Sequence, residues 1–141
     1  MTDWEAQVAR ARAEVAPARL LEGSWVGRGL AHGEPVSATL EVRAILDGTV
    51  VEARERVGEH EDLCLYRWDA ETRQLRVLHV QPGAVVDDHP VEILPPAGLV
   101  WVTGPLAPAV EWSFDGVTLR SAVTWPGASV PEVLLAYRRV P

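Results

Sequence analysis

The chain has 141 residues, with thirteen Arg and no Lys, and its twenty acidic residues give it a net charge of −7. Nucleic acids and anionic membranes attract a basic protein face, so this composition disfavours both as partners. The length fits one domain, and we expect a helical segment over 1–22 followed by β structure over 23–141.

The first predicted element is an amphipathic helix. Thr2 and Glu5 have the spacing of a capping box, which marks a helix start. An apolar stripe at helical spacing follows, made of Trp4, Val8, Ala11 and Val15. Pro17 is expected to end or kink this helix, and the residues after it can add a final turn. Such a helix needs an apolar surface to cover, and we expect that surface to be a barrel mouth or a sheet face.

From Gly23 onward the hydrophobic period changes to that of β-strands, and turn signals recur about every ten residues. Strands are predicted over 24–31, 35–45, 49–57, 61–68, 73–80, 84–94, 99–103, 109–114, 117–125 and 129–139. Every connection is too short to hold a crossover helix, which excludes parallel βαβ folds. Asp115-Gly116 is the strongest turn signal and predicts a type I′ hairpin with both residues at positive φ.

The alternation of residues within these strands predicts which side faces the core. In the second strand the inward set is Val36, Ala38, Leu40 and Val42. So many strands would leave exposed edges in an open sheet, so they are expected to close into a barrel or to fold into a sandwich. Consecutive short hairpins favour a mainly β fold, an antiparallel up-and-down β-barrel of about 8–10 strands with an N-terminal helix. A sandwich is the alternative.

The motif that opens the β region is Gly23-Ser24-Trp25 followed by Gly27 and Gly29, which reads G-x-W-x-G-x-G. The two glycines lie on the same face as Trp25 and allow a neighbouring chain to approach the first strand closely. The Trp25 ring is large enough to plug one end of a barrel.

The order of helix, G-x-W-x-G-x-G strand, hairpin meander and terminal Tyr137-Arg138-Arg139 resembles the calycins. Within that group the chain is similar to lipocalins, fatty-acid-binding proteins, nitrobindin-like barrels and uncharacterised bacterial lipocalin-like families. The resemblance covers Leu20 to Arg139, and it implies a barrel that encloses a small-molecule cavity.

The resemblance gives the C-terminal residues two alternative roles. In lipocalins an Arg from the end of the barrel covers the Trp, which implies that Arg139 or Arg138 stacks on Trp25. In fatty-acid-binding proteins an Arg and a Tyr two residues apart hold a carboxylate. Tyr137 and Arg139 have that spacing in reversed order and would suit an anionic head group. We favour the structural role for the arginines.

Haem is the cofactor that a nitrobindin-like barrel would imply, ligated through a His late in the chain. No His follows His89, so haem is disfavoured and no cofactor is predicted. The single cysteine, Cys64, lacks the spaced partners of a zinc site, and no metal is predicted. Residues 1–5 lack the apolar core of a secretory signal, which predicts a cytoplasmic location.

Polar residues on predicted inward faces are the candidates for chemistry. His79 shares a face with Leu75 and Val77, and Asp87-Asp88-His89 follows and could supply an acid for proton transfer. The alternative interpretation is a polar loop and one hydrogen-bonded core His, which we favour. Glu55 is predicted to face inward as a ligand contact or as a partner of Arg139.

The expected function is non-catalytic binding of a small apolar or amphipathic molecule in a barrel cavity. Its walls are expected to include Leu40, Val110, Trp112, Leu119 and Leu135. The candidate ligand-binding residues are Trp25, Glu55, His79, Trp112, Ser121, Tyr137 and Arg139. One alternative is an acid–base enzyme that uses His79. The other is a packed barrel that acts as an interaction module or homodimer through an exposed aromatic patch at Trp68 or Trp101.

Overall fold

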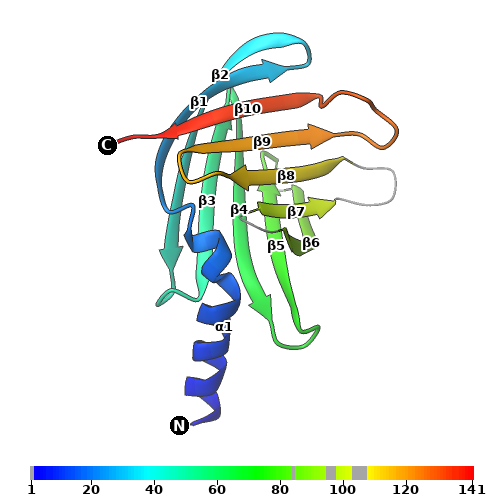
Figure 1. Ribbon diagram of the computed structural model, residues 1–141. Coiled ribbons are helices and arrows are strands. Elements are labelled where there is room, and N and C mark those ends of the chain that lie inside the picture. Colours follow the sequence, from blue (N-terminus) through cyan, green and yellow to red (C-terminus); the bar gives the residue numbers. More distant parts are fainter. Residues whose placement is uncertain (1, 84, 95–97, 103–107) are drawn as a thin grey trace.

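The computed structural model describes residues 2–83, 85–94, 98–102 and 108–141. One helix, α1 (Asp3–Arg19), precedes the strands (Figure 1). The strands are β1 (Gly23–Ala31), β2 (Glu34–Ile45), β3 (Val50–Val57), β4 (His60–Asp69), β5 (Gln74–Gln81), β6 (Val85–Leu94), β7 (Gly98–Val102), β8 (Ala109–Phe114), β9 (Thr118–Thr124) and β10 (Val133–Arg139).

The strands form one closed antiparallel barrel, as predicted. Each strand pairs with the next along the chain, and β1 also pairs with β10 to complete the ring. In Figure 1 the strands β8, β9 and β10 run across β3, β4 and β5, and α1 extends from one end. The ten predicted strands are all present, and the sandwich alternative is wrong. The largest difference in bounds is at β10, which begins at Val133 rather than at residue 129.

The two glycines of the opening motif allow β1 to pack tightly against β10. A Cβ atom on Gly29 would lie 1.9 Å from the carbonyl oxygen of Leu134, and one on Gly27 would lie 2.6 Å from Cδ1 of Tyr137. No side chain fits at either distance, so the closure of the barrel at this seam requires glycine.

The helix begins as the sequence predicts and packs differently. Glu5 N donates to Thr2 Oγ1 at 3.1 Å and Thr2 N donates to Glu5 Oε2 at 2.7 Å, which completes the capping box. Of the predicted apolar stripe only Val15 is buried, and Trp4 is 72% exposed. The N-terminal half of α1 therefore projects beyond the barrel, and the C-terminal half covers one end. Pro17 lies inside the helix and does not end it.

The turn between β8 and β9 differs from the predicted type I′ hairpin. Gly116 has a φ of +96°, but Asp115 is not among the residues at positive φ. The Asp115 carboxylate instead accepts hydrogen bonds from the backbone N–H groups of Val117 and Thr118, at 2.9 and 2.7 Å. The Asp115 backbone N–H also donates to the carbonyl oxygen of Thr118 at 3.3 Å, so the connection is a turn over residues 115–118 that the aspartate side chain reinforces.

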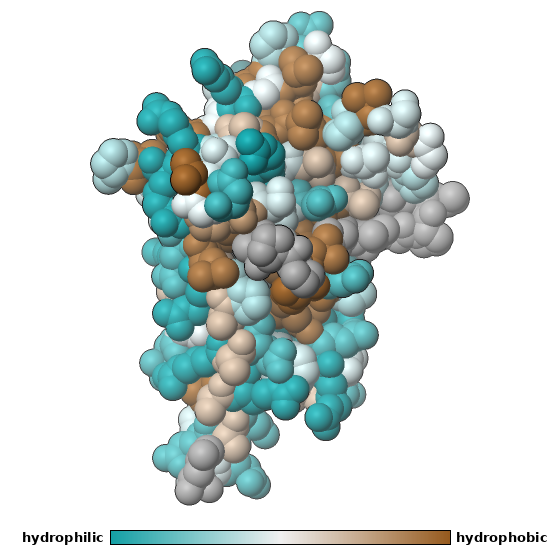
Figure 2. Space-filling view, in the orientation of Figure 1, coloured by the Kyte–Doolittle hydropathy of each residue, from teal (hydrophilic) through white to brown (hydrophobic). Residues whose placement is uncertain are grey.

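The two ends of the barrel are built differently. The end that bears the β2–β3, β4–β5 and β8–β9 turns receives α1, and its interior is filled by buried side chains such as Val15, Trp25 and Leu119. The opposite end bears the β1–β2, β3–β4 and β9–β10 turns. Figure 2 shows a largely hydrophilic surface around α1. Among the described residues no helix is both long and apolar enough to cross a membrane.

Candidate functional site

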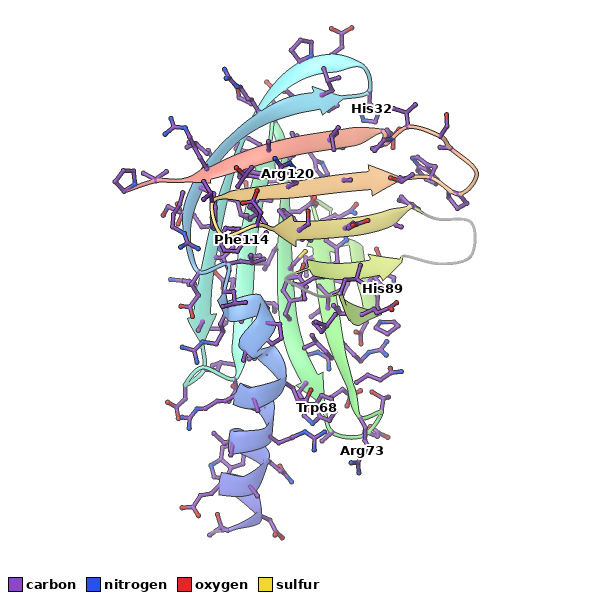
Figure 3. All side chains as sticks on the ribbon, in the orientation of Figure 1. His32, Trp68, Arg73, His89, Phe114 and Arg120 are labelled. Atoms are coloured by element: carbon purple, nitrogen blue, oxygen red, sulfur yellow. The ribbon has the colours of Figure 1, made fainter. Side chains whose placement is uncertain are left out.

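A cavity of about 430 Å³ occupies the barrel interior toward the end away from α1. His32, at its mouth, and Phe114, beside α1, mark the two ends of the barrel in Figure 3. Most of its wall is apolar and comes from Val36, Leu40, Ala53, Val57, Tyr66, Val110, Trp112, Val123 and Val133. Its polar wall gathers on neighbouring strands and comes from Glu55, His60, Asp62, His79 and Gln81.

Glu55 is the deep carboxylate of this wall, and its partner is Tyr137. The Tyr137 hydroxyl donates a hydrogen bond to Glu55 Oε2 across the barrel. The tyrosine ring is held between Gly27, which has no side chain to displace it, and Trp112, whose ring centroid lies 6.1 Å away. Sequence analysis identified both residues as inward-facing. Of the two roles predicted for Glu55, the contact with Arg139 is wrong, because Arg139 stacks on Trp25, and the ligand contact stays a prediction.

The environment of Glu55 changes its protonation. Burial raises the pKa of Glu55 to about 7, the Tyr137 hydrogen bond opposes this rise, and the nearby Asp62 adds to it. Burial and the neighbouring Glu55 also raise the pKa of Tyr137, so its hydroxyl stays a hydrogen-bond donor at neutral pH. The cavity therefore holds a carboxyl group that can change protonation near neutral pH.

A second polar group centres on Asp62. His79 Nε2 lies 3.3 Å and His60 Nε2 lies 2.9 Å from the same atom, Asp62 Oδ1. Gln81 Nε2 lies 3.4 Å from His79 Nδ1. His79 is buried, as predicted, whereas His60 at the end of β4 is half exposed. Sequence analysis missed Asp62, although Asp62, Cys64 and Tyr66 alternate inward along β4.

The acidic residues of β6 that were considered as partners of His79 do not line the cavity. Asp88 lies on the outer face of the barrel, where Arg67 and Arg76 bind its carboxylate at 2.7 and 3.1 Å. Asp87 is opposite His79 in the β5–β6 register, and His89 is buried opposite Val77, but neither lines the cavity. The alternative in which Asp88 supplies the acid for His79 is wrong, because neighbouring residues of a strand point to opposite faces. The favoured interpretation is correct in its buried His79 and wrong in its polar loop, since residues 87–89 lie within β6.

Trp25 and Arg139 form a plug at the α1 end and do not line the cavity. The Arg139 guanidinium lies 4.5 Å from the Trp25 ring centroid, and its Nη2 donates to the carbonyl oxygen of Leu20 at 3.1 Å. Phe114 meets the Trp25 ring edge-on at 5.6 Å, and Trp25 Nε1 donates to the carbonyl oxygen of Leu21 at 2.9 Å. The stacking of Arg139 on Trp25 is confirmed, and Arg139 does not converge with Tyr137 on an anion site.

Of the other residues predicted to form the cavity wall, some line the cavity and others lie outside it. Trp112 lines the cavity, and its buried Nε1 has no hydrogen-bond partner within the described part of the chain. Ser121 is buried opposite Trp112 in the β8–β9 register but does not line the cavity. Leu119 and Leu135, predicted as wall residues, belong to the filled core.

Cys64 lines the cavity as a small apolar residue. Burial raises the pKa of the Cys64 thiol, and the nearby Glu55 and Asp62 carboxylates add to that rise, so the reactive thiolate is disfavoured. Within the described ranges, no group of three or more His, Cys, Asp or Glu side chains is arranged to hold a metal ion.

The sequence matches no protein-family model and no curated protein.

Proposed function

We propose that the protein binds a small apolar or amphipathic molecule in the barrel cavity. The observation that carries this proposal is the cavity itself, a space of about 430 Å³ with an apolar wall and one polar side. Small-molecule sites of proteins have volumes of about 300–1,000 Å³ and walls of this composition. The calycin-like order of elements in the sequence supports the same function.

A homodimer through an aromatic patch at Trp68 or Trp101 stays a prediction. Arg10 stacks on the Trp68 ring at 4.7 Å, and the Trp101 side chain lies outside the described residues.

Filling the cavity tests the proposal. Ala53 lies at the floor of the cavity, so Ala53→Phe is expected to weaken binding of the neutral probe N-phenyl-1-naphthylamine by about tenfold or more. Val117→Phe introduces the same ring at a surface position that is 77% exposed, and it should bind the probe as the wild type does. Fluorescence titration measures both. Failure of the wild-type protein to bind the probe, together with an absence of small molecules in an extract of purified protein, would overturn the proposal.

A second candidate function is proton transfer on a bound substrate. The observation that favours it is the contact of His79 with Asp62 in the wall that also holds Glu55. These groups supply an imidazole beside a carboxylate, together with the Glu55 carboxyl, whose pKa burial raises to about 7, and such groups can act in general acid–base catalysis.

The test of this second candidate is hydrogen–deuterium exchange at the carbons beside the carbonyl of 2-octanone in D₂O, followed by NMR. The wild-type protein is expected to accelerate the exchange, because a base removes the proton and solvent returns deuterium. His79→Ala and Glu55→Gln should each abolish the acceleration while circular dichroism shows an intact barrel. Wild-type exchange no faster than in buffer, or exchange as fast in either variant as in the wild type, would contradict proton transfer.

A further inference from the structure

The polar wall of the cavity indicates which head group its ligand carries. We infer that the cavity takes an amine with an apolar tail, and that the protonated nitrogen of this ligand pairs with the carboxylate of Glu55. This inference rests on the proposed binding function and adds the chemical class of the ligand.

The first support is the charge of the wall. Its ionisable groups are the carboxylates of Glu55 and Asp62, the imidazoles of three His, the buried thiol of Cys64 and the phenol of Tyr66. No Arg lines the cavity in the described part of the chain, none of the remaining residues is Arg, and the sequence has no Lys. Arg139, the cation expected to hold an anion, is instead stacked on Trp25 at the other end. A carboxylate ligand would therefore meet two carboxylates and no guanidinium.

The second support is the difference between the two carboxylates. Asp62 already contacts two imidazoles, His60 and His79, through one oxygen. Glu55 lies deeper, and within the described residues its hydrogen-bond partner is the hydroxyl of Tyr137. A carboxylate has about four acceptor sites, so a single donor leaves Glu55 able to accept more hydrogen bonds. An ammonium group supplies three donors and a positive charge, which is what a buried carboxylate lacks.

The third support is the layout of the wall along the barrel. Glu55 lies between Ala53 and Val57 on β3, so apolar residues flank it on both sides. Leu40 of β2 is its register partner, and Trp112 of β8 lines the same space. A ligand whose nitrogen meets Glu55 can therefore place an apolar tail against Leu40 and Trp112. Hydrophobic burial of the tail and ion pairing of the head then act together.

The proposed ion pair between the Glu55 carboxylate and the ammonium group makes amine binding depend on pH. The titratable groups that face Glu55 are Asp62 and Cys64 of β4, His79 of β5 and Tyr137 of β10. With a pKa of about 7, Glu55 is protonated in the free protein at acidic pH and must lose that proton to pair with an ammonium ion. An alkylamine stays charged up to about pH 10. Affinity for the amine should therefore rise with pH, by up to about a hundredfold between about pH 5 and about pH 8.

The experiment compares octylamine, 1-octanol and octanoate by calorimetry at about pH 8, where Glu55 is largely ionised. The tails match, so the head group decides the order. Octylamine is expected to bind about tenfold or more tightly than octanol, and octanoate is expected to be the weakest. Glu55→Gln should lower the octylamine affinity by about tenfold or more and leave octanol within about threefold. Glu111→Gln removes the same charge from an exposed position of β8 and should change neither affinity.

The outcomes separate the two proposals. If none of the three compounds binds, the proposed binding function fails, and the inference fails with it. If octanol or octanoate binds as tightly as octylamine, the proposed binding function stands, but the inference that the ligand is an amine is overturned. An octylamine affinity that is flat between about pH 5 and about pH 8 would also overturn it. The ligand comparison uses the wild-type protein, so it decides the inference even if Glu55→Gln does not fold.

Discussion

Tyr137 links the seam of the barrel to the chemistry of the cavity. Its ring rests where Gly27 has no side chain, and its hydroxyl reaches Glu55 on β3, past the intervening strands β1 and β2. Gly27, which allows β1 and β10 to pack closely, thereby also sets the position of the Tyr137 hydroxyl as a hydrogen-bond donor. The hydrogen bond favours the ionised form of Glu55, whereas burial favours the neutral form, and burial has the larger effect.

Removing the Tyr137 hydroxyl should therefore raise the pKa of Glu55 above its value of about 7. In Tyr137→Phe the carboxylate loses a charge-assisted hydrogen bond, and we expect a rise of about one pKa unit. NMR titration of the labelled Glu55 side-chain carboxyl measures the change. Tyr66→Phe, which removes the hydroxyl of a tyrosine in the cavity wall, serves as the control. A Tyr137→Phe variant whose Glu55 titrates as in the wild type would contradict this account.

At the scale of the elements, the strands were predictable because their signal is local. Alternation and turn residues depend on neighbours in the chain, so all ten strands of the barrel follow from the sequence. The helix stripe was predicted by the same rule, yet Trp4 is exposed, because periodicity shows which residues share a face and not how far the covered surface extends. The turn at Asp115-Gly116 was predicted in the right place but with the wrong type, because the Asp115 side chain binds the backbone of the turn and the residue keeps a negative φ.

The candidate site was less predictable because it depends on contacts between distant strands. Alternation predicted correctly that Glu55, His79 and Trp112 face the cavity and that Tyr137 faces the barrel interior, although Tyr137 reaches the cavity only through its hydrogen bond to Glu55. Their partners depend on register across the ring: Glu55 meets Tyr137 and not Arg139, and His79 meets Asp62 and not Asp88. Position along the strand also matters, since Arg139 and Trp25 face inward but lie at the filled end. Neither register nor depth can be read from alternation.

On the scale of the whole molecule, the cavity carboxyl makes stability depend on pH. Folding raises the pKa of Glu55 from 4.5 to about 7. Its contribution to stability is therefore fully present below the unfolded pKa and is lost as pH rises through the folded pKa.

We predict that Glu55→Gln is as stable as the wild type near pH 4.5 and more stable above about pH 7.5, by up to about 3 kcal/mol. The uncharged amide avoids the burial of a negative charge at the higher pH. Urea denaturation at both values measures the difference in unfolding free energy between the two proteins. A constant difference across this range would show that Glu55 titrates alike in the folded and unfolded chains.

The plug of Trp25, Phe114 and Arg139 closes the α1 end of the barrel to a ligand. Because these side chains and α1 fill one end, the cavity is a dead end on that side, with its mouth beside His32 and His60. A ligand whose amine pairs with Glu55 must enter with its apolar tail first and must leave through the same mouth. The depth of the cavity beyond Glu55 then limits the length of the ligand's tail, since a tail too long for this space must fold back or stay outside.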